Sequence, residues 1–155
     1  MGLRGRLRVG YNNRAAAMTT PPFLATILML GAATAANQAS FTVQAKAVAW
    51  TAVTLPGVPA GLTQRLLHDH QAKTLVSAIV KFPKGFTEPR HYHTQCGHSI
   101  YVLKGRLKAP DGIWQPGSFN YAAVKEPHGP FTALEETEIL FYTDGPFDYH
   151  VVEEK

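Results

Sequence analysis

The chain has 155 residues, which suggests one domain, and its composition of 45% hydrophobic and 17% charged residues excludes a low-complexity chain. The formal net charge of +4 lies in the arginines at the start, because from Asn37 onward eleven Lys and Arg balance eleven Asp and Glu. A neutral domain lacks the basic surface that binding to nucleic acid or an anionic membrane requires.

The first 36 residues have the order of a secretory signal peptide. Residues 1–17 are basic and lack acids, residues 23–31 form an apolar run too short to span a bilayer, and small residues follow, with Ala33 and Ala35 in an A-x-A pattern. We therefore expect a signal peptide at 1–36 and an exported, periplasmic or secreted, domain at 37–155. A buried helix, an uncleaved anchor and a start at Met18 are the alternatives.

Short apolar stretches follow one another after residue 40, separated by Gly and Pro. The alternation and the breakers predict strands at 74–82, 99–103, 106–108, 118–124, 137–142 and 147–152, and a loop at 55–61. Residues 41–53 show some period-2 character and are the candidate edge strand. Many short strands without a helical stretch indicate an all-β barrel or sandwich, with its core at about 41–152.

Four of the seven histidines form a pattern. His91 and His93 are separated by one residue, so on a strand both point to the same face. His98 begins the next predicted strand, with Ile100 and Val102 on its face, and His128 lies one hairpin further on. Imidazoles that converge in a barrel can hold one divalent metal ion, and neutral imidazole suits Fe, Zn, Ni, Cu and Mn. A hydrogen-bonded histidine cluster without metal is the alternative.

The spacing of these residues resembles the two cupin motifs. Residues 85–105 match G-x5-H-x-H-x4-E-x6-G in every spacing, with His98 in place of the glutamate. Residues 117–132 match the second motif at Gly117 and His128, while Ala123, Lys125 and Thr132 replace its proline, glycine and asparagine. The resemblance, which covers nearly all of 50–150, implies a single-domain cupin: a jelly-roll barrel (double-stranded β-helix).

His98 is the informative departure from the cupin pattern. It turns a site of three histidines and one carboxylate into a possible site of four histidines, in which a dication keeps its full charge. With a gap of three residues, Gly97 would instead take the glutamate position and His98 would turn away. Glu88 could supply the missing carboxylate, although a charge before such a cluster is more often a solvated turn residue.

The resemblance is compatible with several functions, because proteins with the same fold catalyse many different reactions. The first is a metal-dependent enzyme, in its most concrete form an Fe(II) dioxygenase acting on a small diketone or enol-type substrate. A Zn- or Ni-dependent lyase or isomerase fits the same residues. The alternative is a non-catalytic module that binds or senses a small ligand or a metal. By analogy with other cupins, two chains could pair as a homodimer.

Overall fold

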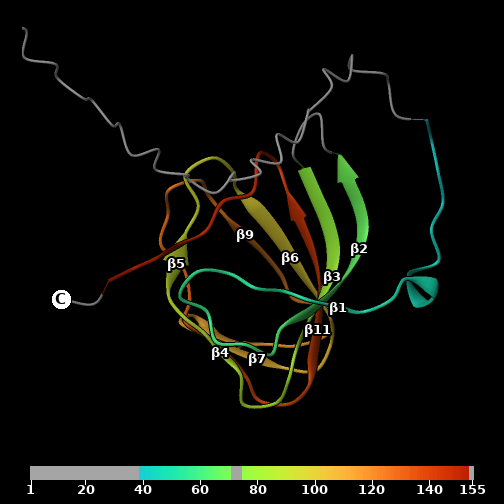
Figure 1. Cartoon of the computed structure of the whole chain (residues 1–155). Coiled ribbons are helices and arrows are strands. Elements are labelled where there is room, and N and C mark those ends of the chain that lie inside the picture. The colour runs from blue at the N-terminus through green and yellow to red at the C-terminus, as the bar shows by residue number, and fades with distance from the viewer. Residues whose placement is uncertain (1–38, 71–74, 154–155) are drawn as a thin grey trace, which may run out of the picture. The chain divides into compact units, whose positions relative to one another are not determined.

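The computed structural model describes residues 39–70 and 75–153, and the predicted signal peptide lies outside these ranges. Within them the chain is almost entirely β-structure (Figure 1). One short 3-10 helix, η1, spans Ala45–Ala47. The strands are β1 Thr51–Ala52, β2 Thr63–His70, β3 Leu75–Phe82, β4 Thr87–Glu88, β5 His91–Tyr92, β6 His98–Lys104, β7 Leu107–Ala109, β8 Gly112–Trp114, β9 Phe119–Ala122, β10 Phe131–Ala133, β11 Thr137–Thr143 and β12 His150–Val151.

The strands form three antiparallel sheets. The largest has the order β1-β2-β3-β11-β6-β9, a second has the order β4-β10-β7-β8, and β12 pairs with β5 in the third. Some neighbouring strands, such as β3 and β11, are distant in sequence, and such pairing is typical of a jelly roll. The predicted all-β barrel is therefore confirmed. Among the described residues no helix is long and apolar enough to cross a membrane.

Alternation along β6 directs one set of side chains into the barrel. His98, Ile100 and Val102 are buried, whereas Tyr101 and Leu103 are exposed on the outer face. The inward residues join the hydrophobic core, whose buried members are Leu62, Phe82, Phe86, Ile100, Val102, Leu107, Ala133 and Ile139. The strand thus fixes His98 at one end of a row that continues as core.

The structure corrects two expectations at the N-terminal side. In the segment 41–53, which we expected to be an edge strand, only Thr51 and Ala52 pair with the sheet. Conversely, β2 was not predicted as a strand, because a bulge between Leu66 and His68 interrupts its alternation. Both errors concern the edge of the large sheet, where β1 has only two paired residues and β2 is interrupted by a bulge.

The outer face of β6, β9 and β11 exposes a contiguous set of large apolar side chains. Tyr101 lies opposite Phe119 of β9 on one side and Leu140 of β11 on the other. Ser99 in the same way separates Tyr121 and Tyr142. The exposed set is Tyr101, Leu103, Phe119, Tyr121, Leu140 and Tyr142, called the aromatic face below. The predicted homodimer stays a prediction.

Candidate metal centre

His91 and His93 lie on and just after β5 and point in the same direction, as predicted from their spacing. Both are buried, while Tyr92 between them is only half-buried. Nδ1 of His91 lies 2.9 Å from the carbonyl oxygen of Pro89, and Nδ1 of His93 contacts the carbonyl oxygen of Asp148. A carbonyl can only accept, so each Nδ1 donates its proton and the lone pair of each neutral ring is on Nε2.

His128 reaches the same place from the loop between β9 and β10. Two backbone hydrogen bonds, of 2.9 and 2.8 Å, pair the main chains of His91 and His128 as an isolated bridge. Nδ1 of His128 lies 2.8 Å from the carbonyl oxygen of Glu126 and therefore also donates its proton. The third histidine thus has the same tautomer as the first two.

The loop before His128 has a left-handed residue where the second cupin motif has glycine. Lys125 has φ of 65°, and its N–H donates to the carbonyl oxygen of His93 at 2.7 Å. The residue at the motif's glycine position thus has a conformation that glycine adopts most easily, and for a lysine it costs about 1–2 kcal/mol. The contact ties this loop to the chain that carries His93.

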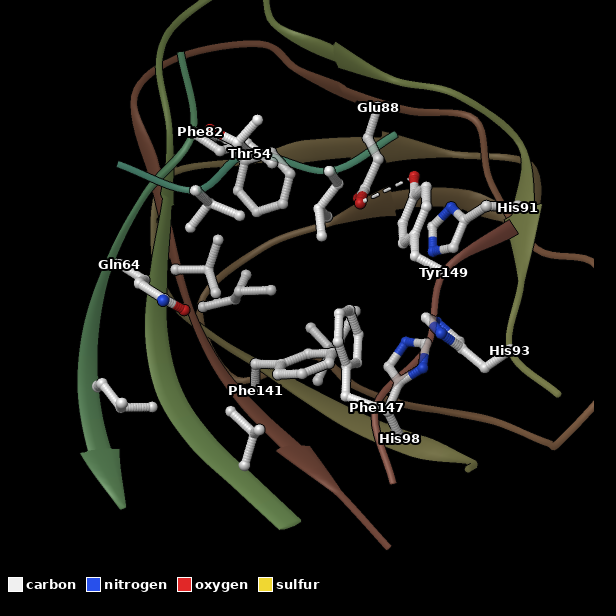
Figure 2. Close-up of a pocket in the computed structure, with 18 of the residues that line it drawn as sticks. Thr54, Gln64, Phe82, Glu88, His91, His93, His98, Phe141, Phe147 and Tyr149 are labelled. Atoms are coloured by element: carbon white, nitrogen blue, oxygen red, sulfur yellow. Dashed lines mark hydrogen bonds between the residues drawn. The ribbon is translucent and has the colours of Figure 1, made fainter. Parts of the chain in front are cut away.

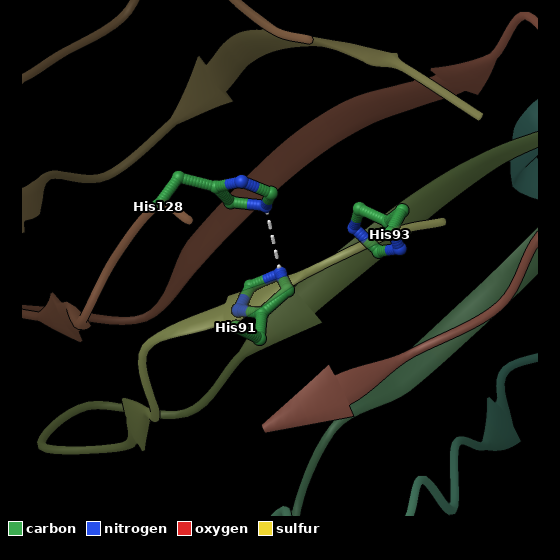
Figure 3. Close-up of side chains that lie close together, drawn as sticks. All are labelled: His91, His93 and His128. Carbon is green, nitrogen blue, oxygen red and sulfur yellow. Dashed lines mark hydrogen bonds between the residues drawn. The ribbon is translucent and has the colours of Figure 1, made fainter. Parts of the chain in front are cut away.

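The three Nε2 atoms converge (Figure 3). The Nε2 atoms of His91 and His128 are 3.0 Å apart, and the ring nitrogens of the three residues that could bind a metal all lie within 4.8 Å of one another. Nε2 of His93 is buried and has no hydrogen-bond partner. In a metal centre, one nitrogen of each histidine binds the ion, and the other donates a hydrogen bond that holds the ring in place. The three rings have this arrangement, with Nε2 free and Nδ1 donating to a carbonyl. His91, His93 and His128 could therefore hold a metal ion.

His98 lies beside this group without adding an atom to it. Its ring centroid is 4.8 Å from those of both His93 and His128, and its Nδ1 is buried without a hydrogen-bond partner. It faces inward, so the alternative in which Gly97 takes its place does not describe this strand. That His98 is a fourth ligand remains a prediction.

Burial keeps the cluster uncharged. It lowers the pKa of His91 to about 3 and that of His98 to about 2, and it also lowers the pKa of His93 and His128. Mutual repulsion among the rings adds to this effect. The histidines are therefore neutral at physiological pH, which is the state in which they can bind a metal.

Asp148 holds the chain that supports His93. Its carboxylate accepts hydrogen bonds from the backbone and hydroxyl of Thr94, from the backbone N–H of Gln95 and from His150. Burial acts against its ionisation, but these bonds prevail and lower its pKa to about 2. The carboxylate of Asp148 thus holds the residues that follow His93 in the chain, while its backbone carbonyl contacts Nδ1 of His93.

Cys96 belongs to a second group with His93 and Asp148, whose potential ligand atoms also lie within 4.8 Å of one another. It is buried, and burial raises the pKa of its thiol to about 11. Because Nδ1 of His93 is engaged with the carbonyl of Asp148 and the thiol stays protonated, this second group does not offer a metal the free donor atoms that the first group offers. Cys96 is therefore a buried thiol that stays protonated.

Glu88 is buried in β4, so it is not the solvated turn residue that is commoner in such positions. The hydroxyl of Tyr149 donates to its Oε1 over 3.4 Å (Figure 2). Burial raises the pKa of Glu88 to about 7, although the bond from Tyr149 acts against this shift. The carboxyl group can therefore gain or lose a proton near neutral pH.

Tyr149 is the site residue that sequence reasoning missed. Its ring stacks on that of His91 with centroids 4.3 Å apart, and burial raises the pKa of its hydroxyl, which stays a donor. It thus connects Glu88 to the histidines. One signal in the sequence could have found it, since the run from Gly145 to Tyr149 resembles the same stretch of small cupins.

A cavity of about 430 Å³ opens beside the cluster. The side chains of His91, His93, His98, Glu88 and Tyr149 form one end of it, and the remainder is mostly aliphatic and aromatic (Figure 2). A largely apolar cavity with a few converging polar groups is the usual form of a small-molecule site.

Barrel, histidine cluster and cavity together define a cupin with a candidate metal centre. The chain belongs to the ChrR cupin-like domain family, whose sequence profile matches residues 38–148. No curated protein matches it in sequence.

Several solved structures are similar to the chain. The polyketide cyclase RemF from Streptomyces resistomycificus has 26% identity and a TM-score of 0.61, over 76% of this chain and 88% of that one. An acetylacetone dioxygenase from Acinetobacter johnsonii has 16% identity and a TM-score of 0.57, over 77% and 80%. The Rhodobacter sphaeroides complex of SigE with the anti-sigma ChrR has 17% identity and a TM-score of 0.51, over 65% and 52%. The last two similarities concern the fold alone.

Proposed function

We propose that this protein is an exported, metal-dependent enzyme that acts on a small diketone or enol-type substrate, in the manner of an Fe(II) dioxygenase. The observation that carries the proposal is the convergence of the Nε2 atoms of His91, His93 and His128 at one end of a cavity. These residues, with His98 as a fourth, would hold one divalent ion. A bound ion would supply a Lewis-acidic centre for the substrate's carbonyl oxygens and, as iron, access to O₂ chemistry.

The chain itself provides the proton chemistry. Glu88, within hydrogen-bonding reach of Tyr149, is placed to accept the acidic proton of an enol or of the carbon between two carbonyls. The hydroxyl of Tyr149 is placed to donate a hydrogen bond to the resulting oxyanion. Phe141 and Phe147 pack against His98 and His93 and keep water from that end of the cavity.

A redox-neutral reaction is the second candidate. The 26% identity to a polyketide cyclase favours it, since a cyclisation of carbonyl compounds needs proton transfer and no oxidant. In this form a zinc or nickel ion in the same site would serve a lyase or isomerase. A third candidate is a cupin that binds or senses a ligand without turnover, and the complex of ChrR with SigE offers a precedent for a non-enzymatic role.

Metal analysis and O₂ uptake separate these candidates. The full chain is purified without chelator or nickel affinity resin, and its metals are quantified beside those of the double variant His91→Ala/His93→Ala. We expect about one equivalent of a single metal in the wild type and none in the variant. O₂ uptake matched to loss of acetylacetone supports the dioxygenase; loss of a diketone without O₂ supports the redox-neutral reaction. Metal without turnover supports the binding protein, and no metal after reconstitution overturns the proposal.

The exported location is supported by the basic, apolar and small segments in residues 1–36. Expression of the full chain with fractionation of the cells tests it. We expect the protein outside the cytosol, with an N-terminus that begins after Ala35 or Ala36. A cytosolic protein that keeps Ala33 would contradict export.

A further inference from the structure

The histidines, Glu88 and Tyr149 gather at one end of the cavity. Figure 2 shows the histidines and Tyr149 on one side and Gln64 of β2 on the opposite side. Between them the walls are aliphatic and aromatic side chains of β2, β3, β6, β10 and β11. Those walls include Leu66, Val76, Val80, Ile100, Phe131 and Ile139.

Lys and Arg are missing from the described residues that line this cavity, whose acidic side chains are Glu88 and the exposed Asp69. The basic residues of the neighbouring strands point to the other face of the sheet. Arg65 of β2 and Lys81 of β3 both lie over the ring of Trp50, at 4.4 and 4.2 Å from its centroid. An anionic group in the far part of the cavity would thus lose its water without meeting a cation, which is costly.

The volume sets the size of the occupant. A dry cavity of about 150 Å³ accommodates benzene, and this one has about 430 Å³. Part of this volume, at the histidines, would hold the oxygen atoms of a substrate. The remaining part has space for a group larger than the methyl groups of the smallest diketones.

We infer that the site binds a molecule of about 10–15 non-hydrogen atoms, with its oxygen-bearing end at the histidines and an uncharged, apolar body toward β2 and β3. The inference rests on the proposed function for the location of the polar end. The apolar part of the ligand then determines which ligands bind best. Each additional apolar group that is buried strengthens binding, and a charge at the distal end weakens it.

Three probes with the same diketone end test this inference by calorimetry. They are acetylacetone, 1-phenylbutane-1,3-dione, and the latter with a para-carboxylate on its ring. Titrations use the full chain, both metal-free and loaded with zinc, which does not react with O₂. We expect the phenyl compound to bind at least about tenfold more tightly than each of the other two. Equal affinities, or tighter binding of the carboxylate, would overturn the inference.

A charge placed at the far end sharpens the test. Gln64 is half-buried at that end, so Gln64→Lys should bring a cation near the distal carboxylate and raise its affinity by about tenfold. The matched variant Gln64→Met should leave the order of the three probes unchanged. If Gln64→Lys does not fold, the probe series on the wild type still decides.

The probe series separates this inference from the proposed function. An enzyme that consumes acetylacetone but does not prefer the phenyl compound keeps the function and overturns the inference. A protein that prefers the phenyl compound, but turns over none of the probes when loaded with iron, zinc or nickel, keeps the inference and removes the enzymatic role. Failure of all three probes to bind to either form overturns the inference.

Discussion

The Nε2 atoms of His91 and His128 face each other at 3.0 Å, although each ring donates its Nδ1 proton to a backbone carbonyl. With both Nδ1 atoms protonated, neither neutral ring has a proton left for the other, so two lone pairs are directed at each other. A cation bound between them would turn this repulsion into attraction. The two carbonyls of Pro89 and Glu126 therefore prepare the site, because they fix which nitrogen of each ring is free.

The first prediction concerns His98. Its buried Nδ1 lacks a partner and its ring adjoins His93 and His128, so we expect His98→Ala to weaken zinc binding at least about tenfold without abolishing it. Competition with a chromophoric chelator measures the affinity.

Two further variants serve as controls for His98→Ala. His98→Glu restores the residue of the common cupin motif and should retain zinc. His68→Ala removes a histidine that contacts Phe41 outside the cluster and should bind zinc as the wild type does. An unchanged affinity in His98→Ala would show that His98 is a cavity residue and not a ligand.

The second prediction is a pH dependence of stability that arises from Glu88. Burial raises its pKa in the folded protein from 4.5 to about 7, so ionisation costs the folded state more than the unfolded one. Below pH 4.5 the carboxyl group is neutral in the folded and in the unfolded protein. As the pH rises from 4.5 to about 7, the group ionises more readily in the unfolded protein, so the free energy of unfolding falls. From the two pKa values, the loss amounts to about 3 kcal/mol above pH 7.

Urea unfolding of metal-free Glu88→Gln beside the wild type measures this effect, because glutamine keeps the shape and cannot ionise. The variant should match the wild type near pH 4.5 and exceed its free energy of unfolding at pH 8. A difference between Glu88→Gln and the wild type that does not change with pH would show that Glu88 is not buried as a neutral acid.

The third prediction uses the two glycines that bound the first motif. Both have left-handed backbones, with φ of 81° at Gly85 and 80° at Gly105. A Cβ at Gly85 would meet nothing within 4 Å, whereas at Gly105 it would lie 2.4 Å from the carbonyl oxygen of Glu136. Gly85→Ala should thus cost only the conformational strain of about 1–2 kcal/mol, and Gly105→Ala clearly more.

Denaturant midpoints of the two glycine variants give the comparison. Because the strain is common to both, the difference between them isolates the contact with the strand start at Glu136 and Thr137. Equal losses of stability would mean that the turn at Gly105 can move away from this strand.

These glycines also show why the fold could be predicted. A cupin motif records positions where only one residue type fits, such as Gly105, and strands where alternation persists, such as β6. The convergence of His91, His93 and His128 was predicted for the same reason, because these residues match the motif's spacing. The environment of Glu88 was not predictable, because its burial depends on Phe131 in the pairing strand β10 and on Tyr149, 61 residues away.

The last prediction concerns the aromatic face. Its six side chains are apolar or hydroxylated and carry no charge, so two copies can meet there without repulsion between like charges, and burial of the exposed rings would drive association. We expect the full chain to sediment as a dimer, and the double variant Tyr101→Asp/Phe119→Asp to sediment as a monomer with its zinc affinity intact. The matched variant Arg90→Asp changes an exposed residue outside that face and should remain dimeric. A wild type that stays monomeric at high micromolar concentration would contradict this prediction.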